Sequence, residues 1–564
     1  MGRHQGNYSD GSVSGLFSRR ILRDGKLIAA LTLLLSGCVG AISGLGGASG
    51  NGGAGDQSDL ASELVNGRLR QRIWRLTPSE FAAEMSVLFG SQVPDLGNLP
   101  EGSPVNGFTN GAAGLMVDET TSSATFYATE DYAGYVADNA ATLVQCEGAT
   151  VGSRECAQIF LSSLASRAYR RPVESSELDA LMALYDNGAT DDFATGIKVS
   201  VHAVLNSPFF LYRTEIGDAA TQNGDERKLT QYEIASMLSF IITGHSPDQE
   251  LLNAAQNGEL YDAAVRTEHA RRLFESSSEV WGRFALQWLD LGRLDLATKQ
   301  GELYPQFSEQ LVEEMRQETQ SFVQNIFVEQ KGSFVDLFTA SYTWTTPALA
   351  DIYGATHPGS GLAKIDLDPS TRSGVLTQLS WLTNFAGTAD SSLERRGLFV
   401  WRNLICNVIP PPPAGAAQQQ ASLVAADASK EEIVLARAAT PTCNGCHQVM
   451  DPIGMGLENY GALGEYRDQV DGNTVNPVGT IPDFGSFTGA VELSATIAQD
   501  PTAQACFSQR FAQYVLGSDL GSPNETDWLN SAHESFLSHT TTIEELLVGL
   551  VAHEGFIERN TGGS

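Results

Sequence analysis

The five residues Cys443-Asn444-Gly445-Cys446-His447 constrain this chain more than any other stretch. Their spacing, C-x-x-C-H, is the one used to attach a c-type haem. On a short helix, two cysteines three positions apart project from the same face, so their thiols can add to two vinyl groups of one porphyrin. The histidine that follows can then bind the iron. The pattern predicts covalent haem c and its iron, anchored by Cys443 and Cys446 and ligated by His447.

The residues on either side of this motif predict its local structure. Ser429 with Glu432 forms a capping-box pattern, which predicts a helix just before the cysteines. We expect Pro452 to end the motif's own helix, because proline lacks a donor and restricts the residue before it. The carbonyl of Pro452 or of a neighbour is then expected to accept the second imidazole N–H of His447.

Three other uses of the C-x-x-C pair stay open. It can be a thioredoxin-like redox pair, half of a zinc site or a structural disulfide. Zinc needs two further soft ligands nearby, yet the sequence has no second C-x-x-C and no H-x-x-x-H. A thioredoxin-like pair follows a strand in a βαβ unit, whereas helical patterns surround this one. We therefore favour haem.

Few residues are candidates for the sixth ligand of the iron, because no methionine follows Met455. Met450 lies three residues beyond His447 on the same helical face, so it belongs to the proximal side. An extended segment from His447 to Met455 spans up to roughly 26–29 Å and can wrap round the haem edge. Gly454 and Gly456 allow the backbone to turn there. We favour Met455 over an open position. Weaker candidates are His533, His539 and His553.

The N-terminus has the features of a lipoprotein signal. Basic residues precede a short apolar run, 27–35, which leads into Leu35-Ser36-Gly37-Cys38. This pattern is typical of a signal peptide over residues 1–37, with Cys38 acylated as the mature N-terminus. A Gly-rich tether over 38–68 follows. We expect a lipid-anchored protein of the cell envelope, periplasmic or facing the outer surface.

The charge of the chain bears on its partners. With 67 acidic and 35 basic residues, the formal net charge is −32. Such a chain does not present the basic surface that nucleic acid needs. The expected partners are a redox partner protein and, through the lipid anchor, a membrane.

Four cysteines remain once Cys38 and the motif pair are assigned. An even remainder in an exported protein predicts disulfides. Cys146 and Cys156 lie close enough to close a small loop, which contributes about 2–4 kcal/mol when unstrained. By elimination, Cys406 is expected to form a disulfide with Cys506.

The periodicity of apolar residues is mostly helical, and no βαβ alternation occurs. We predict a mainly α fold, a multi-domain helical body with a small C-terminal cytochrome-c-like helical module. The aromatic residues Trp281, Phe284 and Trp288 fall at helical spacing and are expected in the core. Glu314 and Glu318 are expected on a solvated helix face. The expected domains after the tether are an N-terminal helical module (69–145), a helical module with the cysteine pair (146–195), a central helical domain (196–360), the module with C-x-x-C-H (370–475) and a C-terminal helical module (476–560).

A series of motifs in fixed order carries a family resemblance over roughly residues 70–560. They are RLTPSEF at Arg75, CAQIFLSSLASRAYRRPV at Cys156, NSPFFLYRTE at Asn206, ALQWLDL at Ala285, YPQF at Tyr304, GVLTQLSWLT at Gly374, RRGLFVWRNLIC at Arg395, CNGCHQVMDPIGMGLENYGALGEYR at Cys443 and CFSQRFAQYVLG at Cys506. The chain resembles exported multi-module proteins of planctomycete and myxobacterial type, built from domains of unknown function around a planctomycete-type cytochrome-c haem-binding motif. The resemblance implies this architecture, a c-type haem module and an extracytoplasmic setting, and it implies no substrate.

Two classes of function follow. The first is an exported haem-c lipoprotein with a redox role, either electron transfer or oxidation of an unknown substrate. The second is a non-haem envelope scaffold, or a carbohydrate- or partner-binding protein, whose C-x-x-C is a disulfide. No nucleotide-binding loop, nucleophile elbow or H-E-x-x-H occurs in the sequence to add another activity.

Overall fold

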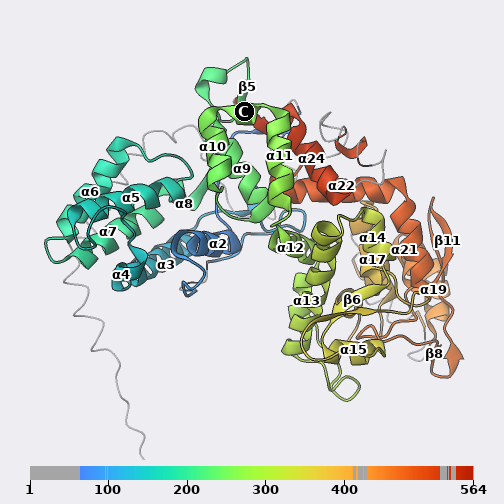
Figure 1. The fold of residues 1–564 in the computed structure, drawn as a ribbon. Coiled ribbons are helices and arrows are strands. Elements are labelled where there is room, and N and C mark those ends of the chain that lie inside the picture. The colour runs from blue at the N-terminus through green and yellow to red at the C-terminus, as the bar shows by residue number, and fades with distance from the viewer. Residues whose placement is uncertain are drawn as a thin grey trace, which may run out of the picture. The chain divides into compact units, whose positions relative to one another are not determined.

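The computed structural model describes residues 64–562, apart from 66, 96, 98, 411–413, 417–418, 420–422, 425–427, 521–529, 531, 535 and 537–541. Helices dominate the described chain, and its strands are short (Figure 1). The prediction of a mainly α, multi-domain fold is confirmed. In these ranges no helix is both long and apolar enough to cross a membrane. Cys38, the expected signal peptide and most of the tether lie outside the described residues.

The chain forms two compact units, which we call the small unit and the large unit. The small unit is described over residues 125–210, and the large unit comprises 62–124 and 211–564. The helices of the small unit are α3 (Glu119–Asp138), which enters it at residue 125, α4 (Ala140–Leu143), α5 (Arg154–Ala168), α6 (Ser175–Gly188), α7 (Phe193–Leu205) and α8 (Pro208–Leu211).

A close helix contact and a disulfide stabilise the small unit. Gly196 on α7 faces Tyr185 on α6, where an added Cβ would lie 2.8 Å from the ring. Cys146 is bonded to Cys156, which joins the loop after α4 to the first turn of α5. Ser153 caps α5 by accepting a hydrogen bond from the Cys156 amide at 3.1 Å.

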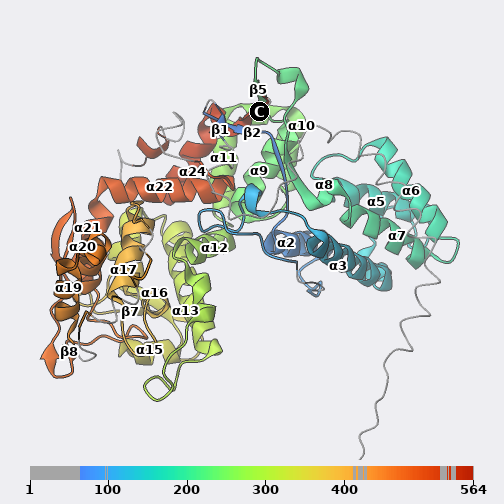
Figure 2. The same ribbon diagram turned by 180° about the vertical axis from the view of Figure 1, so that it is seen from behind.

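The large unit begins with short strands that pair with distant parts of the chain. Its first elements are β1 (Leu64–Val65), β2 (Arg68–Arg70), β3 (Arg72–Arg75), α2 (Pro78–Phe89), η3 (Ala112–Gly114), β4 (Tyr212–Glu215), η4 (Ala219–Thr221) and β5 (Glu226–Lys228). A four-stranded sheet has the order β1-β2-β12-β5, with β12 (Glu558–Asn560) parallel to β2 and antiparallel to β5. Figure 2 shows β1 and β2 beside β5 at the C-terminus. The two ends of the described chain are therefore joined in one sheet.

Helices, with a few short strands between them, form the rest of the large unit. Its central elements are α9 (Gln231–Thr243), α10 (Gln249–Asn257), η5 (Glu259–Tyr261), α11 (Ala263–Phe274), α12 (Ser278–Trp288), η6 (Leu291–Leu296), α13 (Glu309–Gln324), η7 (Asn325–Glu329), α14 (Phe334–Thr339), β6 (Tyr342–Thr345), α15 (Pro347–Tyr353), β7 (Ala363–Asp366), η8 (Val375–Thr377) and α16 (Leu379–Asn384). Its last elements are α17 (Leu393–Phe399), η9 (Val400–Leu404), α19 (Lys430–Ala439), α20 (Pro441–Met455), β8 (Gln469–Val470), β9 (Asn473–Thr474), β10 (Val478–Ile481), β11 (Gly485–Thr488), α21 (Gly489–Gln499), α22 (Pro501–Leu516), α24 (Ile543–Ala552) and α25 (Glu554–Ile557).

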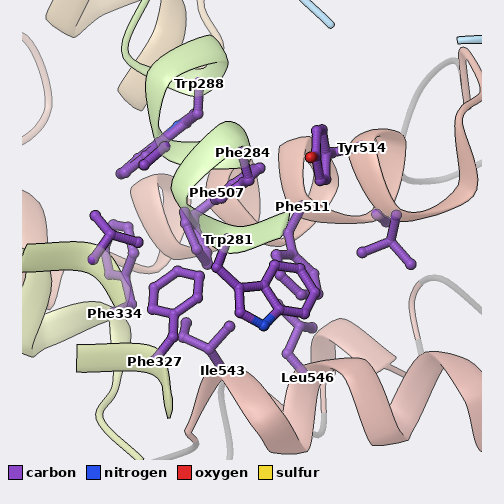
Figure 3. Close-up of a cluster of buried hydrophobic side chains, with 14 of the residues drawn as sticks. Trp281, Phe284, Trp288, Phe327, Phe334, Phe507, Phe511, Tyr514, Ile543 and Leu546 are labelled. Atoms are coloured by element: carbon purple, nitrogen blue, oxygen red, sulfur yellow. The ribbon is translucent and has the colours of Figure 1, made fainter. Parts of the chain in front are cut away.

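An aromatic cluster between α12 and α22 forms the centre of the core (Figure 3). Trp281 stacks on Phe511 with ring centroids 5.4 Å apart, and Trp288 meets Phe507 edge-on at 5.1 Å. Phe284 lies between them and is fully buried. Each aromatic pair contributes about 0.5–1.5 kcal/mol beyond the area that it buries. The expectation that these α12 side chains are core residues is confirmed.

The second disulfide also lies in the large unit. Cys406, just after η9, is bonded to Cys506 on α22, with their Cα atoms 5.4 Å apart. The bridge links the segment that leads towards the C-x-x-C-H motif to a helix of the aromatic core. All four cysteines left over by the sequence argument are therefore in disulfides.

The expectation that Glu318 lies on a solvated face is wrong. Its side chain on α13 is fully buried, where Oε1 accepts hydrogen bonds from Thr343 at 3.0 Å and Tyr353 at 2.5 Å. Burial raises the pKa of Glu318 to about 7, since its close partners are neutral hydroxyls. The strand β6 covers this face of the helix, and helical periodicity cannot reveal such a covering.

Candidate functional site

The helix α20 carries the whole C-x-x-C-H motif. Thr440 precedes it and Pro441 occupies its first turn, where the missing amide donor costs nothing. Cys443 is buried with 6% of its surface exposed, and Cys446 is partly exposed. Both are free thiols. Because they lie three positions apart on one helix, they share a face, as the sequence predicted.

His447 is held by a buried carboxylate one helical turn further on. Its Nδ1 lies 2.9 Å from Oδ1 of Asp451, whose side chain is fully buried. We expected a backbone carbonyl near Pro452 in this place, and the partner is a side chain instead. In the described chain Nε2 has no hydrogen-bond partner. An imidazole held at Nδ1 presents Nε2, which is the nitrogen that a metal ligand uses.

Two further side chains extend this arrangement. Arg437 on α19 donates to Oδ2 of Asp451 at 3.1 Å and to Glu394 on α17 at 2.7 Å. Burial by itself would raise the pKa of Glu394, but hydrogen bonds and Arg437 lower it to about 2. Glu394 is therefore anionic at neutral pH and keeps Arg437 in place. Asp451, Arg437 and Glu394 were not expected as site residues from the sequence. The spacing of Asp451 from His447, one helical turn, is the signal that could have found Asp451.

Glycines let α17 approach α20 closely, and Figure 2 shows the two helices side by side. A Cβ on Gly397 would lie 1.8 Å from the carbonyl oxygen of Met450. A Cβ on Gly454 would lie 2.3 Å from the carbonyl oxygen of Leu393. Only glycine fits at both positions, and the contact places Glu394 within reach of Arg437.

The prediction that the helix ends at Pro452 is wrong, because α20 continues to Met455 with Pro452 inside it. A proline inside a helix removes one amide donor and crowds the carbonyl four residues before it, which costs about 3 kcal/mol. Tertiary packing holds this stretch, since Ile453 is fully buried and the β10 strand covers Pro452. A Cβ on Gly479 of β10 would lie 2.4 Å from the Pro452 carbonyl oxygen.

Continuation of the helix also changes the place of Met455. Eight residues of helix rise only about 12 Å, so the extended path that would wrap Met455 round a haem is not formed. Its side chain is 6% exposed. Next to it, a Cβ on Gly456 would lie 2.2 Å from the ring of Phe487, so the turn expected there is packed against the hairpin. Met450 is likewise buried on α20.

The downstream histidines have other partners. Nδ1 of His533 lies 2.8 Å from the hydroxyl oxygen of Ser508. Nδ1 of His553 accepts a hydrogen bond from the amide of Gly555 at 3.0 Å and caps α25. His539 lies outside the described residues. The contacts of His533 and His553 give neither of them a role at the thiols.

The thiols lie on a helix that packs against α19 and beside the segment that contains Pro410. Cys446 Sγ lies 4.0 Å from the carbonyl oxygen of Pro410, and on this same segment Val408 is 84% exposed. On α19, Leu435 is 69% exposed. Within the described ranges no three His, Cys, Asp or Glu side chains are grouped to hold a metal ion, which disfavours a zinc site. The element before α20 is a helix, which disfavours a thioredoxin-like pair.

Comparison with known families identifies three segments. Residues 156–215 match a family of proteins of unknown function, PSD5 (DUF1595). Residues 229–355 match a second, PSD4 (DUF1592), and residues 372–470 match a third, PSCyt3 (DUF1588). No curated protein and no solved structure matches the chain. The protein thus has a multi-domain architecture of modules of unknown function, and the C-x-x-C-H helix lies in the DUF1588 segment.

Proposed function

We propose that this protein is an exported lipoprotein that binds a c-type haem and has a redox role. The observation that carries the proposal is the arrangement on α20. Two free thiols share a face, and the adjacent His447 is held at Nδ1 by Asp451. A free C-x-x-C pair followed by an oriented imidazole is the donor set that covalent haem attachment needs.

Each residue has a defined part in this proposal. Cys443 and Cys446 form the thioethers, and Nε2 of His447 binds the iron. The haem, when bound, supplies one-electron redox chemistry. Asp451 fixes the plane of the imidazole and makes it a stronger donor, as carboxylate partners of metal-bound histidines do. Arg437 partly neutralises that carboxylate, so the pair adjusts the electron density at the ligand.

The sixth position decides between electron transfer and substrate oxidation. The sequence favoured Met455, whose thioether would suit electron transfer. In the structure Met455 belongs to the same helix as His447, and the end of α20 would have to unwind before its sulfur met the iron from the other side. The helix therefore favours an open position, which would admit a small oxidant or substrate.

The alternative function is a non-haem scaffold in which Cys443 is bonded to Cys446. The bonding of the other cysteines argues against this alternative. The structure pairs Cys146 with Cys156 and also forms the second disulfide, yet leaves the motif pair reduced.

A pyridine haemochrome spectrum of protein matured in the periplasm tests the proposal. The expected result is a c-type spectrum and a mass increase of one haem, both lost when Cys443 and Cys446 are changed to alanine. A control variant, Cys146→Ala with Cys156→Ala, should keep the haem. A colourless protein whose motif cysteines are bonded to each other would instead establish the scaffold.

The lipid anchor is tested separately. Labelled palmitate should be incorporated into the wild-type chain and not into a Cys38→Ser variant, because acylation is expected on that thiol. Undiminished labelling of the variant would contradict the anchor and leave the haem proposal standing.

A further inference from the structure

A cavity of about 220 Å³ lies in the large unit, and no residue of α20 is part of its lining. The segment that follows η6 forms one wall, and the segment between α16 and α17 forms the other. Three basic side chains line it, Arg293, Lys299 and Arg395, while no acidic side chain does so. The volume corresponds to about seven water molecules, which is smaller than a site for a drug-sized ligand.

Lys299 and Arg395 are held in the wall by backbone carbonyls. Lys299 Nζ donates to the carbonyl oxygens of Thr383 at 3.0 Å and Gly387 at 2.9 Å. An ammonium group has three donors, so one remains for a ligand. Arg395 uses one terminal nitrogen on the carbonyl of Ala386 at 2.8 Å and keeps its other donors. Both side chains are thus held in place and still have hydrogen-bond donors left for a ligand.

Neither of these two cations has a carboxylate within 4.0 Å in the described part of the chain. By contrast, two other cations near α17 do have anionic partners. Arg437 pairs with Glu394 at 2.7 Å, and Arg467 pairs with Asp390 at 2.6 Å. Acidic residues outnumber basic ones 67 to 35, so unpaired cations converging on one cavity run against the composition.

The electrostatics of Lys299 agree with this geometry. Burial, with the charges of Arg396 and Arg395, lowers its pKa to about 8, while Glu465 acts in the opposite direction. The local potential at Lys299 is therefore positive, although the third cation of the lining, Arg293, is paired with Asp290 at 3.4 Å. An anion in the cavity would favour the charged ammonium and raise that pKa again.

We propose that this cavity is a binding site for a small anion that carries a carboxylate or phosphate group. Lys299 supplies a compact charge, and Arg395 supplies a planar fork that matches two oxygens of such a group. Leu296, which is 80% exposed, lies at the same wall and covers a short apolar body of the ligand. The site is independent of haem attachment.

Calorimetric titration of the purified full-length protein at constant ionic strength tests the site. The probes are inorganic phosphate and succinate, which separate the two sources of the charged group. We expect saturable binding of at least one probe, with affinity about tenfold weaker in Arg395→Gln, or about 1.4 kcal/mol. Affinity should also fall as the pH rises above about 8, where Lys299 loses its proton.

The matched control is Arg402→Gln, which removes the same charge from an exposed residue of η9 outside the cavity. It should leave the affinity unchanged, because screened surface charge contributes little. Absence of saturable binding by both probes would overturn the proposal, and so would equal affinity in Arg395→Gln. Since Arg395 is exposed, thermal unfolding of that variant should match the wild type, which excludes misfolding as the cause.

Discussion

The two halves of α20 differ in what surrounds them. In the N-terminal half, Gly445 is open, with no atom within 4 Å of an added Cβ, and Cys446 is partly exposed. In the C-terminal half, Asp451 and Ile453 are fully buried, and Gly454 is in backbone contact with α17. The C-terminal half is anchored by packing, while the N-terminal half carries the two thiols. His447 lies at the boundary and is joined to the anchored half by Asp451.

The largest expected effect comes from Asp451→Ala. Arg437 loses one of its two carboxylate partners and His447 loses its acceptor, which costs at most about 3–5 kcal/mol of unfolding free energy. Denaturant unfolding measures this loss. The control Asp468→Ala removes an exposed carboxylate and should change stability little. A similar stability for both variants would show that the anchored half does not depend on this pair.

Glycine substitutions compare the halves directly. Gly454→Ala places a methyl group 2.3 Å from the Leu393 carbonyl oxygen and should cost about 1–3 kcal/mol or more. Gly445→Ala meets open space within a helix and should gain about 0.5–1 kcal/mol. Thermal unfolding of the two variants measures both. Equal effects would contradict the division of α20 into an anchored and an open half.

Glu394→Gln tests the ion pair between Glu394 and Arg437. The folded-state pKa of Glu394, about 2, lies below its ordinary value of 4.5. Its stabilisation is therefore present above pH about 4.5 and is lost as the pH falls towards 2. Since this side chain is 34% exposed, we expect a loss of about 1–2 kcal/mol near neutral pH.

Unfolding free energies measured from neutral to acidic pH should converge for wild type and Glu394→Gln as the pH falls. Glu431→Gln, on the first turn of α19, serves as the control and should follow the wild type at every pH. A constant difference across the whole range would show that Glu394 acts through packing rather than charge.

The smallest effect is expected for Met455→Leu. A volume-conserving change in the core costs less than about 1.5 kcal/mol, and the spin state of the haem protein should not change. Absorption spectroscopy of the haem-loaded variant measures the latter. Loss of a far-red thioether band would restore Met455 as the sixth ligand, and the end of α20 would then have to unwind.

Local patterns predicted much of this molecule. The Ser429–Glu432 capping box appears in α19 as expected, with the Ser429 amide donating to Glu432 at 2.8 Å. The aromatic spacing of α12 correctly marked core residues. Predictions that depend on packing against another element were wrong, because the periodicity of one helix does not show which of its faces another element covers. Glu318 and Pro452 are both misassigned for that reason.

The candidate site divides in the same way. Sequence alone determined the thiols, the imidazole and their common helix, because a spacing of three or four residues places side chains on one face whatever the tertiary fold. Only the tertiary structure decided which groups hold His447. Arg437 and Glu394 come from separate helices, and the glycine contact of α17 with α20 brings them together. Tertiary packing also kept Met455 in the helix, since buried contacts on both sides of Pro452 outweigh the lost hydrogen bond and the steric crowding that proline causes.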